Sequence, residues 1–268
     1  MTLPVPRTAN GRLALASLLA EPADALIAMD YDGTLAQIVY RPEVAVAHPD
    51  AAAVLRTLSA KGARVAIVTG RPAADAVRLG GFADVPGLVV LGHYGLERWS
   101  DGRLDTPVEH TGVAVARAAG AEIVARAPAG VVLEDKGHSV AFHTRGAADP
   151  GAVLAEIRPQ VDDLAHDTGL EVAPGRFVLE LRPPGVDKGT SLRGLVADAA
   201  ARSVTFVGDD LGDLAAVSAL RSLDVAGLVV CSDSAESPPP LRSEADLVVD
   251  GPDGVVAFLA GVAYRMAS

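Results

Sequence analysis

The chain has 268 residues, half of them hydrophobic, and this length suits one large domain or a core domain with a smaller insert. Asp and Glu number 34 against 23 Lys and Arg, so most of the surface is expected to repel nucleic acid and anionic membranes. The single cysteine, Cys231, excludes an internal disulfide and fits a reducing compartment.

The first apolar segment, residues 11–25, is expected to form a short helix. Arg7 lies before this segment and Arg12 near its start, an arrangement also found in signal peptides. However, Glu21, Pro22 and Asp24 interrupt the apolar run, which favours a short helix. No segment approaches the roughly 18 apolar residues that a membrane span needs. We therefore expect a monomer in the cytoplasm that binds neither nucleic acid nor membranes.

Several apolar runs end in a polar residue or a turn and are typical of strands covered on both faces. Residues 49–62 and 189–203 lie between such runs and are expected to be helices. This alternation predicts an α/β fold with a doubly wound parallel sheet, which binds ligands outside the carboxyl ends of its strands. The expected strands and the turns after them are residues 25–30, 64–70, 87–95, 204–210, 227–233 and 246–251.

Residues 107–184 have a different pattern, which predicts a smaller inserted α+β cap domain. Segments 131–145 and 170–182 are each expected to form two short strands around a turn, the second with Pro174 and Gly175 at its corner. Between these hairpins the apolar spacing is that of a helix.

The expected helix of the insert covers residues 149–169 and is interrupted by Pro159. Proline-containing linkers would join the insert to a core made of residues 1–106 and 185–268. Residues 237–240, with the sequence SPPP, are expected to form a rigid surface loop.

The sequence ALIAMDYDGTLAQI, residues 25–38, leads an apolar strand directly into Asp30 and Asp32. A carboxylate at a strand end can act as a nucleophile, and a second one across an Asp-Gly turn can transfer a proton. Taken alone, the same Asp-Gly pair also fits a simple turn. Two carboxylates this close repel one another unless one is protonated or a cation lies between them, so Mg²⁺ is expected. Asp209, in VGDDLGD, is the best-placed additional ligand.

The order of these polar residues along the chain is more specific than any one of them. It runs from the DYDGT segment through Thr69 and Arg71 in VTGR to Lys188 and then GDDLGD, residues 208–213. This order resembles the haloacid dehalogenase superfamily of phosphotransferases. The resemblance implies a haloacid dehalogenase-like core with its motifs at the carboxyl ends of the strands.

The resemblance also implies a role for each matched residue. Asp30 would attack phosphorus and form an aspartyl phosphate, while Asp32 would protonate the departing oxygen and later activate water. Thr69 and Lys188 would hold the phosphoryl oxygens. Mg²⁺ would be bound by Asp30, the backbone carbonyl of Asp32 and Asp209, with Asp210 and Asp213 behind these ligands.

Within this superfamily, the segments EDKGHSVAFHTR and LELRPPGVDKGTSL, together with DYDGTLAQI and GHYGLER, resemble the trehalose-6-phosphate phosphatases. The resemblance implies hydrolysis of trehalose 6-phosphate to trehalose and phosphate, in trehalose biosynthesis. It implies that three cap residues contact sugar hydroxyls, namely Glu134, Lys136 and Glu180. It also implies that the core side of the cleft is bordered by Gly70, Arg71 and the loop 92–97 with His93.

The sequence departs from the family pattern at four positions. Gly212 replaces Thr and Leu214 replaces Glu in the last acidic motif, Tyr94 replaces His in GHYG, and Gln37 replaces Pro. Because Tyr94 lies in a loop expected to face substrate, affinity or selectivity is expected to differ from that of relatives.

Three alternatives stay open. The enzyme could act on another sugar phosphate, such as sucrose 6-phosphate or a glycosylated phosphoglycerate. The charged cap residues could form a solvated hairpin face. The chain could also be a phospho-acceptor module that holds an aspartyl phosphate, although such a module needs neither Asp32 nor a cap.

Overall fold

The computed structural model describes residues 3–39, 41–234 and 238–266. The chain divides into two compact units. Unit 1 comprises Met1–Thr106 and Asp187–Ser268, and unit 2 comprises Pro107–Val186.

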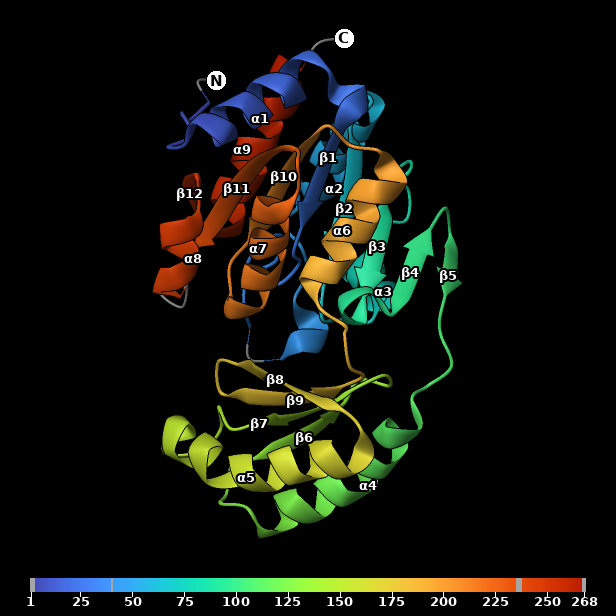
Figure 1. Cartoon of the computed structure of the whole chain (residues 1–268), viewed down its shortest axis with the longest axis vertical. Helices are drawn as coiled ribbons and strands as arrows, with labels where there is room; N and C mark the ends of the chain where they lie inside the picture. Colours follow the sequence, from blue (N-terminus) through green and yellow to red (C-terminus); the bar gives the residue numbers. More distant parts are fainter. Residues whose placement is uncertain (1–2, 40, 235–237, 267–268) are drawn as a thin grey trace. The chain divides into compact units, whose positions relative to one another are not determined.

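Unit 1 is built on a sheet with the strand order β12-β11-β10-β1-β2-β3-β4-β5 (Figure 1). Neighbouring strands from β12 to β3 are parallel, whereas β4 and β5 are antiparallel. The strands are β1 (Ala25–Met29), β2 (Arg64–Val68), β3 (Val89–Gly92), β4 (Glu97–Ser100), β5 (Arg103–Asp105), β10 (Ser203–Gly208), β11 (Ala226–Asp233) and β12 (Leu247–Asp250).

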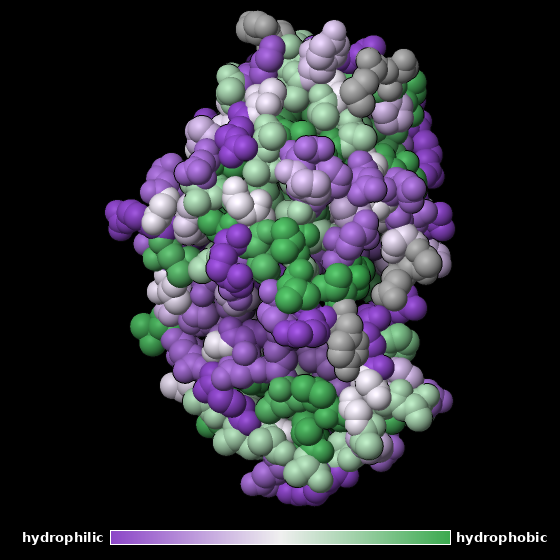
Figure 2. Space-filling model, turned by 180° about the vertical axis from the view of Figure 1, so that it is seen from behind, coloured by the Kyte–Doolittle hydropathy of each residue, from purple (hydrophilic) through white to green (hydrophobic). Residues whose placement is uncertain are grey.

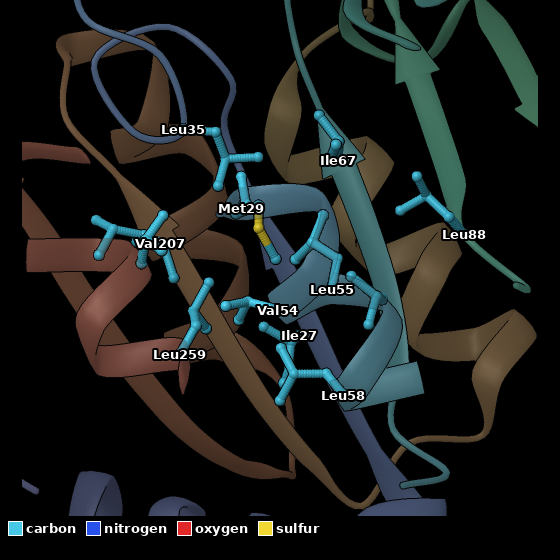
Figure 3. Close-up of a cluster of buried hydrophobic side chains, with 14 of the residues drawn as sticks. Ile27, Met29, Leu35, Val54, Leu55, Leu58, Ile67, Leu88, Val207 and Leu259 are labelled. Atoms are coloured by element: carbon cyan, nitrogen blue, oxygen red, sulfur yellow. The ribbon is translucent and has the colours of Figure 1, made fainter. Parts of the chain in front are cut away.

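Helices cover both faces of this sheet, because the side chains of each central strand alternate between two buried clusters. In β1, Ile27 and Met29 belong to one cluster and Leu26 and Ala28 to the other. Figure 3 shows the first cluster, with side chains of β1 and β2 directed toward those of α2 and α9. The predicted doubly wound fold is confirmed in unit 1.

The helices on the first face of the sheet include the predicted N-terminal helix and residues 49–62. They are α1 (Ala9–Ala20), α2 (Ala51–Ala60), α3 (Ala73–Gly80) and α9 (Gly251–Arg265). On the second face lie α6 (Lys188–Ala199), α7 (Leu214–Ser222) and α8 (Pro239–Glu244). Short 3₁₀ turns are η1 (Pro22–Asp24), η2 (Pro42–Val44), η3 (His93–Gly95) and η4 (Leu211–Asp213).

Unit 2 has an antiparallel sheet with the order β6-β7-β9-β8, and α4 and α5 pack on one face of it. Phe142 and Leu179 point toward these helices, whereas Ala141 and Glu180 point to the opposite face, which we call the polar face. The elements are α4 (Thr111–Arg126), β6 (Val132–Asp135), β7 (Val140–His143), α5 (Pro150–Thr168), β8 (Glu171–Gly175) and β9 (Val178–Arg182).

Three local predictions about prolines were wrong: a turn at Pro174 and Gly175, an interruption of the helix at Pro159, and a loop at residues 237–240. Pro174 and Gly175 lie inside β8, and the turn is formed by Arg176 and Phe177, because Gly175 pairs directly with Val178. Pro159 does not interrupt α5, which continues from Pro150 to Thr168.

The physical reason for the unbroken α5 is its packing. Ile157 and Val161, on either side of the proline, are buried in the core of unit 2, and this burial outweighs the hydrogen bond that proline cannot donate. In the predicted SPPP loop, Pro239 and Pro240 instead begin α8, where a helix needs no N–H donors. Ser237 lies outside the described residues.

Among the described residues no helix is both long and apolar enough to cross a membrane. Large exposed apolar side chains include Val5, Val108 and Tyr264, which lie far apart in the sequence. The face shown in Figure 2 carries groups of apolar residues separated by hydrophilic ones.

Cys231 in β11 is buried, and burial, together with the charges of Asp233 and Asp209, raises the pKa of its thiol to about 12. We expect no labelling of the native protein by a thiol reagent at pH 8, because the thiolate is the reacting species. The unfolded chain loses this proton near pH 9, so stability should fall as the pH rises from about 9 to 12. Labelling at the rate of the denatured protein would contradict this burial.

Candidate active site

Asp30 follows the buried strand β1 and is itself 5 % exposed. Its backbone N–H donates to the carbonyl of Val207, and its Oδ1 accepts the N–H of Tyr31 at 2.6 Å. The chain then turns at Gly33, whose φ of +68° is readily adopted only by glycine. The strand therefore delivers a carboxylate to the carboxyl end of the sheet.

Lys188 brings two distant carboxylates together. Its Nζ lies 2.5 Å from Oδ2 of Asp30 and 2.8 Å from Oδ1 of Asp213, and the lysine is 3 % exposed. Asp187 caps the helix that begins at Lys188 by accepting the N–H of Thr190. Three of the predicted site residues are thus in direct contact.

The turn after β10 orders the remaining carboxylates. Oδ2 of Asp213 accepts the N–H groups of Asp209 and Asp210 at 2.9 and 3.1 Å, and Asp210 in turn accepts the N–H of Gly212. A Cβ on Gly33 would lie only 2.0 Å from Oδ2 of Asp209. Asp209 is therefore beside the Asp32–Gly33 turn.

The cluster carries more negative charge than its lysine can balance. Burial, and then the neighbouring carboxylates, raise the pKa of both Asp30 and Asp209 well above the ordinary value, although Lys188 opposes the shift. Burial alone would lower the pKa of Lys188, but Asp213 and Asp30 raise it well above its ordinary value, so this lysine is charged.

The residues present fit a hard cation. Oδ1 of Asp209 is buried and has no hydrogen-bond partner among the described residues, which is costly for a carboxylate oxygen without a cation. One oxygen from each of Asp30, Asp210 and Asp213 also lies within 4.8 Å of the others. Oxygen ligands of this kind are those that Mg²⁺ prefers.

Thr69, at the end of β2, is buried, and its Oγ1 accepts the N–H of Arg71 at 3.1 Å. Arg71, predicted to face substrate, holds Asp32 with two parallel hydrogen bonds of 2.5 Å each. Its guanidinium also lies 5.2 Å from the ring centre of Tyr31. Such a bidentate contact fixes the orientation of the Asp32 carboxylate.

The loop 92–97 packs on the segment that carries Thr69 and Arg71. The backbone N–H of His93 donates to the Arg71 carbonyl, and that of Tyr94 donates to the Thr69 carbonyl, both at 2.9 Å. A Cβ on Gly70 would lie 2.6 Å from the hydroxyl of Tyr94. His93 is buried, 2 % exposed.

On the polar face of unit 2, the predicted sugar-binding residues form one network. Nζ of Lys136 lies 3.1 Å from Glu180 and 3.9 Å from Glu134. The hydroxyl of Ser139 donates to Glu180 at 2.5 Å, and Nε2 of His143 lies 2.8 Å from Glu134. Unit 2 therefore brings Glu134, Lys136 and Glu180 together.

The family model described as trehalose-phosphatase matches residues 28–251 of this chain, from inside β1 to the start of α9. The chain belongs to the trehalose-phosphatase family. The predicted family resemblance and the fold class, with its haloacid dehalogenase-like architecture, are thereby confirmed.

Two curated relatives of this trehalose-phosphatase family chain are much longer than the part that it matches. A Mycobacterium tuberculosis protein named an uncharacterized glycosyl hydrolase is 34% identical over 250 residues, which cover 88% of this chain and 18% of that protein. The trehalose-phosphate phosphatase of Mycobacterium avium is 34% identical over 214 residues, 75% of this chain and 52% of the relative. The chain thus spans about half or less of these two relatives.

Among solved structures, the C-terminal domain of a C. albicans trehalose-6-phosphate phosphatase superposes with a TM-score of 0.79. The match covers 100% of both chains at 19% sequence identity, and it supports the fold alone.

Two residues of this trehalose-phosphatase family chain that the sequence analysis did not predict form hydrogen bonds to the backbone of the site. The buried Ser232, at the end of β11, donates its hydroxyl to the Gly33 carbonyl at 2.6 Å. Ser191 in α6 donates to the carbonyl of Tyr94. The polar ending of the strand run GLVVCSD was a signal for Ser232, because strand ends of a parallel sheet converge. Ser191 left no comparable signal.

Proposed function

We propose that this protein is a Mg²⁺-dependent phosphatase that hydrolyses trehalose 6-phosphate to trehalose and inorganic phosphate. The observation that carries the proposal is the contact of Lys188 with both Asp30 and Asp213, together with an oxygen of Asp209 that has no hydrogen-bond partner among the described residues. A buried cation between carboxylates, next to a second cation site, suits a dianionic phosphate ester.

Mg²⁺ would be held by Asp30, the backbone carbonyl of Asp32 and Asp209, with Asp210 and Asp213 ordering these ligands. When bound, the ion neutralises charge on the phosphoryl oxygens and on the carboxylates around it. Oδ1 of Asp209, which is buried without a hydrogen-bond partner in the part of the chain that the structure describes, supports this assignment.

In the first step, an oxygen of Asp30 forms a bond to phosphorus while the bond from phosphorus to the sugar oxygen breaks. Asp32, which carries a proton in this step and has released one of its two contacts with Arg71, gives that proton to the departing sugar oxygen. Lys188 and Thr69 hold the phosphoryl oxygens during this transfer. The products of the step are trehalose and an aspartyl phosphate on Asp30.

In the second step, Asp32 takes a proton from a water molecule, whose oxygen attacks the phosphorus. The bond from phosphorus to Asp30 breaks, inorganic phosphate leaves, and Asp32 is again protonated. The bidentate contact with Arg71 keeps the Asp32 carboxylate in one orientation.

Unit 2 is proposed to act as the cap that recognises the sugar. Glu134 and Glu180 would accept hydrogen bonds from sugar hydroxyls, and Lys136 would donate to their oxygens. From unit 1, Gly70, Arg71 and His93 would border the substrate. The role of the protein would be trehalose biosynthesis, as a monomer in the cytoplasm.

The test is phosphate release with Mg²⁺ from trehalose 6-phosphate, sucrose 6-phosphate, glucose 6-phosphate and a glycosylated phosphoglycerate. We expect trehalose 6-phosphate to have the highest kcat/KM. Preference for another ester would keep the chemistry and replace the proposed substrate. A stable aspartyl phosphate without phosphate release would instead indicate a phospho-acceptor module. If neither a phosphoenzyme nor phosphate release were detected, both the phosphatase and the phospho-acceptor proposals would be rejected.

A further inference from the structure

Arg117, in the middle of α4, contacts two segments that are distant in sequence. Its Nη2 donates to Oε1 of Glu109 at 2.6 Å and to the carbonyl of Gly137 at 3.2 Å. Its Nε forms an ion pair with Oδ2 of Asp135 at 2.6 Å. One guanidinium therefore joins the segment that enters unit 2 to the turn between β6 and β7.

That turn is tightly built. Oδ1 of Asp135 accepts the N–H of Gly137 at 2.9 Å, and the N–H of Lys136 donates to the carbonyl of Ser139 at 3.0 Å. Gly137 has a φ of +85°. Arg117 thus binds the acidic side chain that opens the turn and the carbonyl at its tip, so it restrains the turn at two points.

The same turn supplies two partners of Glu180. Lys136 and Ser139 bind its two carboxylate oxygens, Oε2 at 3.1 Å and Oε1 at 2.5 Å. A shift of the turn would therefore move Lys136 and Ser139 together and change the orientation of Glu180 on the polar face.

The pKa shifts of Arg117 and Asp135 are those expected for a close ionic contact between them. The hydrogen bond from Arg117 to Glu109 and the close ion pair of Arg117 with Asp135 raise the pKa of the guanidinium. Burial opposes a low pKa for Asp135, but the N–H of Gly137 and Arg117 together hold the pKa of this carboxyl below its ordinary value. The Asp135 carboxylate and the Arg117 guanidinium are consequently ionised at neutral pH.

We propose that Arg117 is a positioning residue for sugar recognition: it anchors the turn 135–139 to α4 and so fixes Lys136 and Ser139 on Glu180. The inference rests on the proposed function, because it assumes that this network binds the sugar. Arg117 itself touches neither the substrate nor the reacting atoms in this scheme.

The test compares Arg117→Gln with Arg126→Gln, a matched loss of charge on the same helix. Within the described part of the chain, Arg126 pairs only with the exposed Glu122, at 2.8 Å. For Arg117→Gln we expect KM for trehalose 6-phosphate to rise about three- to ten-fold with kcat nearly unchanged, since the loss concerns ground-state positioning. Activity on p-nitrophenyl phosphate, which has no sugar, should not change, and Arg117→Lys should recover part of the affinity.

A double-mutant cycle with Asp135→Asn adds a second criterion. If Arg117 acts through this turn, the two substitutions together should raise KM by less than the product of their separate effects. Multiplicative effects would show that Arg117 does not act through Asp135 and would overturn the proposal. An equal loss on both esters would also overturn it, because it would reveal a general structural role.

Amide hydrogen exchange at Lys136 and Gly137 gives a readout that needs no activity. We expect faster exchange in Arg117→Gln than in Arg126→Gln. Unchanged exchange would overturn the anchoring even if KM rose. If the parent protein hydrolysed no sugar phosphate while exchange still increased, the proposed function would fail and the sugar-positioning role with it, but the anchor itself would stand.

Discussion

Replacing Asp30 with Asn is expected to lower phosphate release from trehalose 6-phosphate by at least about a thousand-fold. The amide has no ionised oxygen to attack phosphorus, whereas its volume matches that of the carboxylate. Phosphate release by purified variant and parent protein measures the effect. Asp84→Asn, at an exposed loop position, is the matched control and should keep full activity.

The same substitution should leave the fold intact. The N–H of Tyr31 donates to Oδ1 of Asp30, and the amide oxygen of Asn can accept it equally. Burial and neighbouring carboxylates raise the pKa of Asp30, so removing this charge relieves repulsion, while Lys188 retains Asp213 as its partner. We expect a melting temperature equal to or above that of the parent. Substantial remaining turnover would reject Asp30 as the nucleophile.

The fold explains why an apolar strand can end in buried negative charge. β1 is buried along its whole length, which fixes the position of the residue after it. Lys188 reaches Asp30 from the first turn of α6, on the neighbouring layer. A stable strand and a preorganised lysine thus supply the positioning that phosphoryl transfer chiefly requires.

The convergence of Asp30, Thr69 and Asp209 could be predicted because it depends on one regular feature. Apolar runs covered on both faces indicate parallel strands, and the carboxyl ends of parallel strands meet at one edge of the sheet. The backbone pairing of β1 with β2 and β10 places the residues that follow these strands side by side. Local pattern was sufficient for this part of the site.

The contacts made by Arg71 and Arg117 could not be predicted in the same way. Arg71 reaches Asp32 because β2 lies beside β1, and Arg117 reaches Asp135 across the packing of α4 on β6. Contacts between side chains on different elements leave no periodic signal in the sequence. Pro159 was misread for a related reason, since the burial that keeps α5 continuous is a tertiary effect.

Asp209→Asn is expected to abolish the stabilisation of the protein by Mg²⁺. A ligand that binds only the folded state at about a hundred times its Kd adds about 2.7 kcal/mol. For a unit of this size, that corresponds to a rise in Tm of roughly 5 to 10 °C. The parent protein should show this rise on addition of Mg²⁺, and the variant should show little or none.

The reason lies in the oxygen that the protein leaves unsatisfied. Oδ1 of Asp209 is buried without a hydrogen-bond partner among the described residues, and the pKa of this carboxyl is raised by burial and by Asp30. An amide there loses the charge that attracts the ion, so the metal-free variant should be at least as stable as the metal-free parent. Asp198→Asn, an equal change of charge at an exposed position on α6, is the control and should keep the full Mg²⁺ effect. A variant at Asp209 that Mg²⁺ still stabilised as strongly as the parent would place the ion elsewhere, with the group of Asp30, Asp210 and Asp213 as the next set of ligands to test.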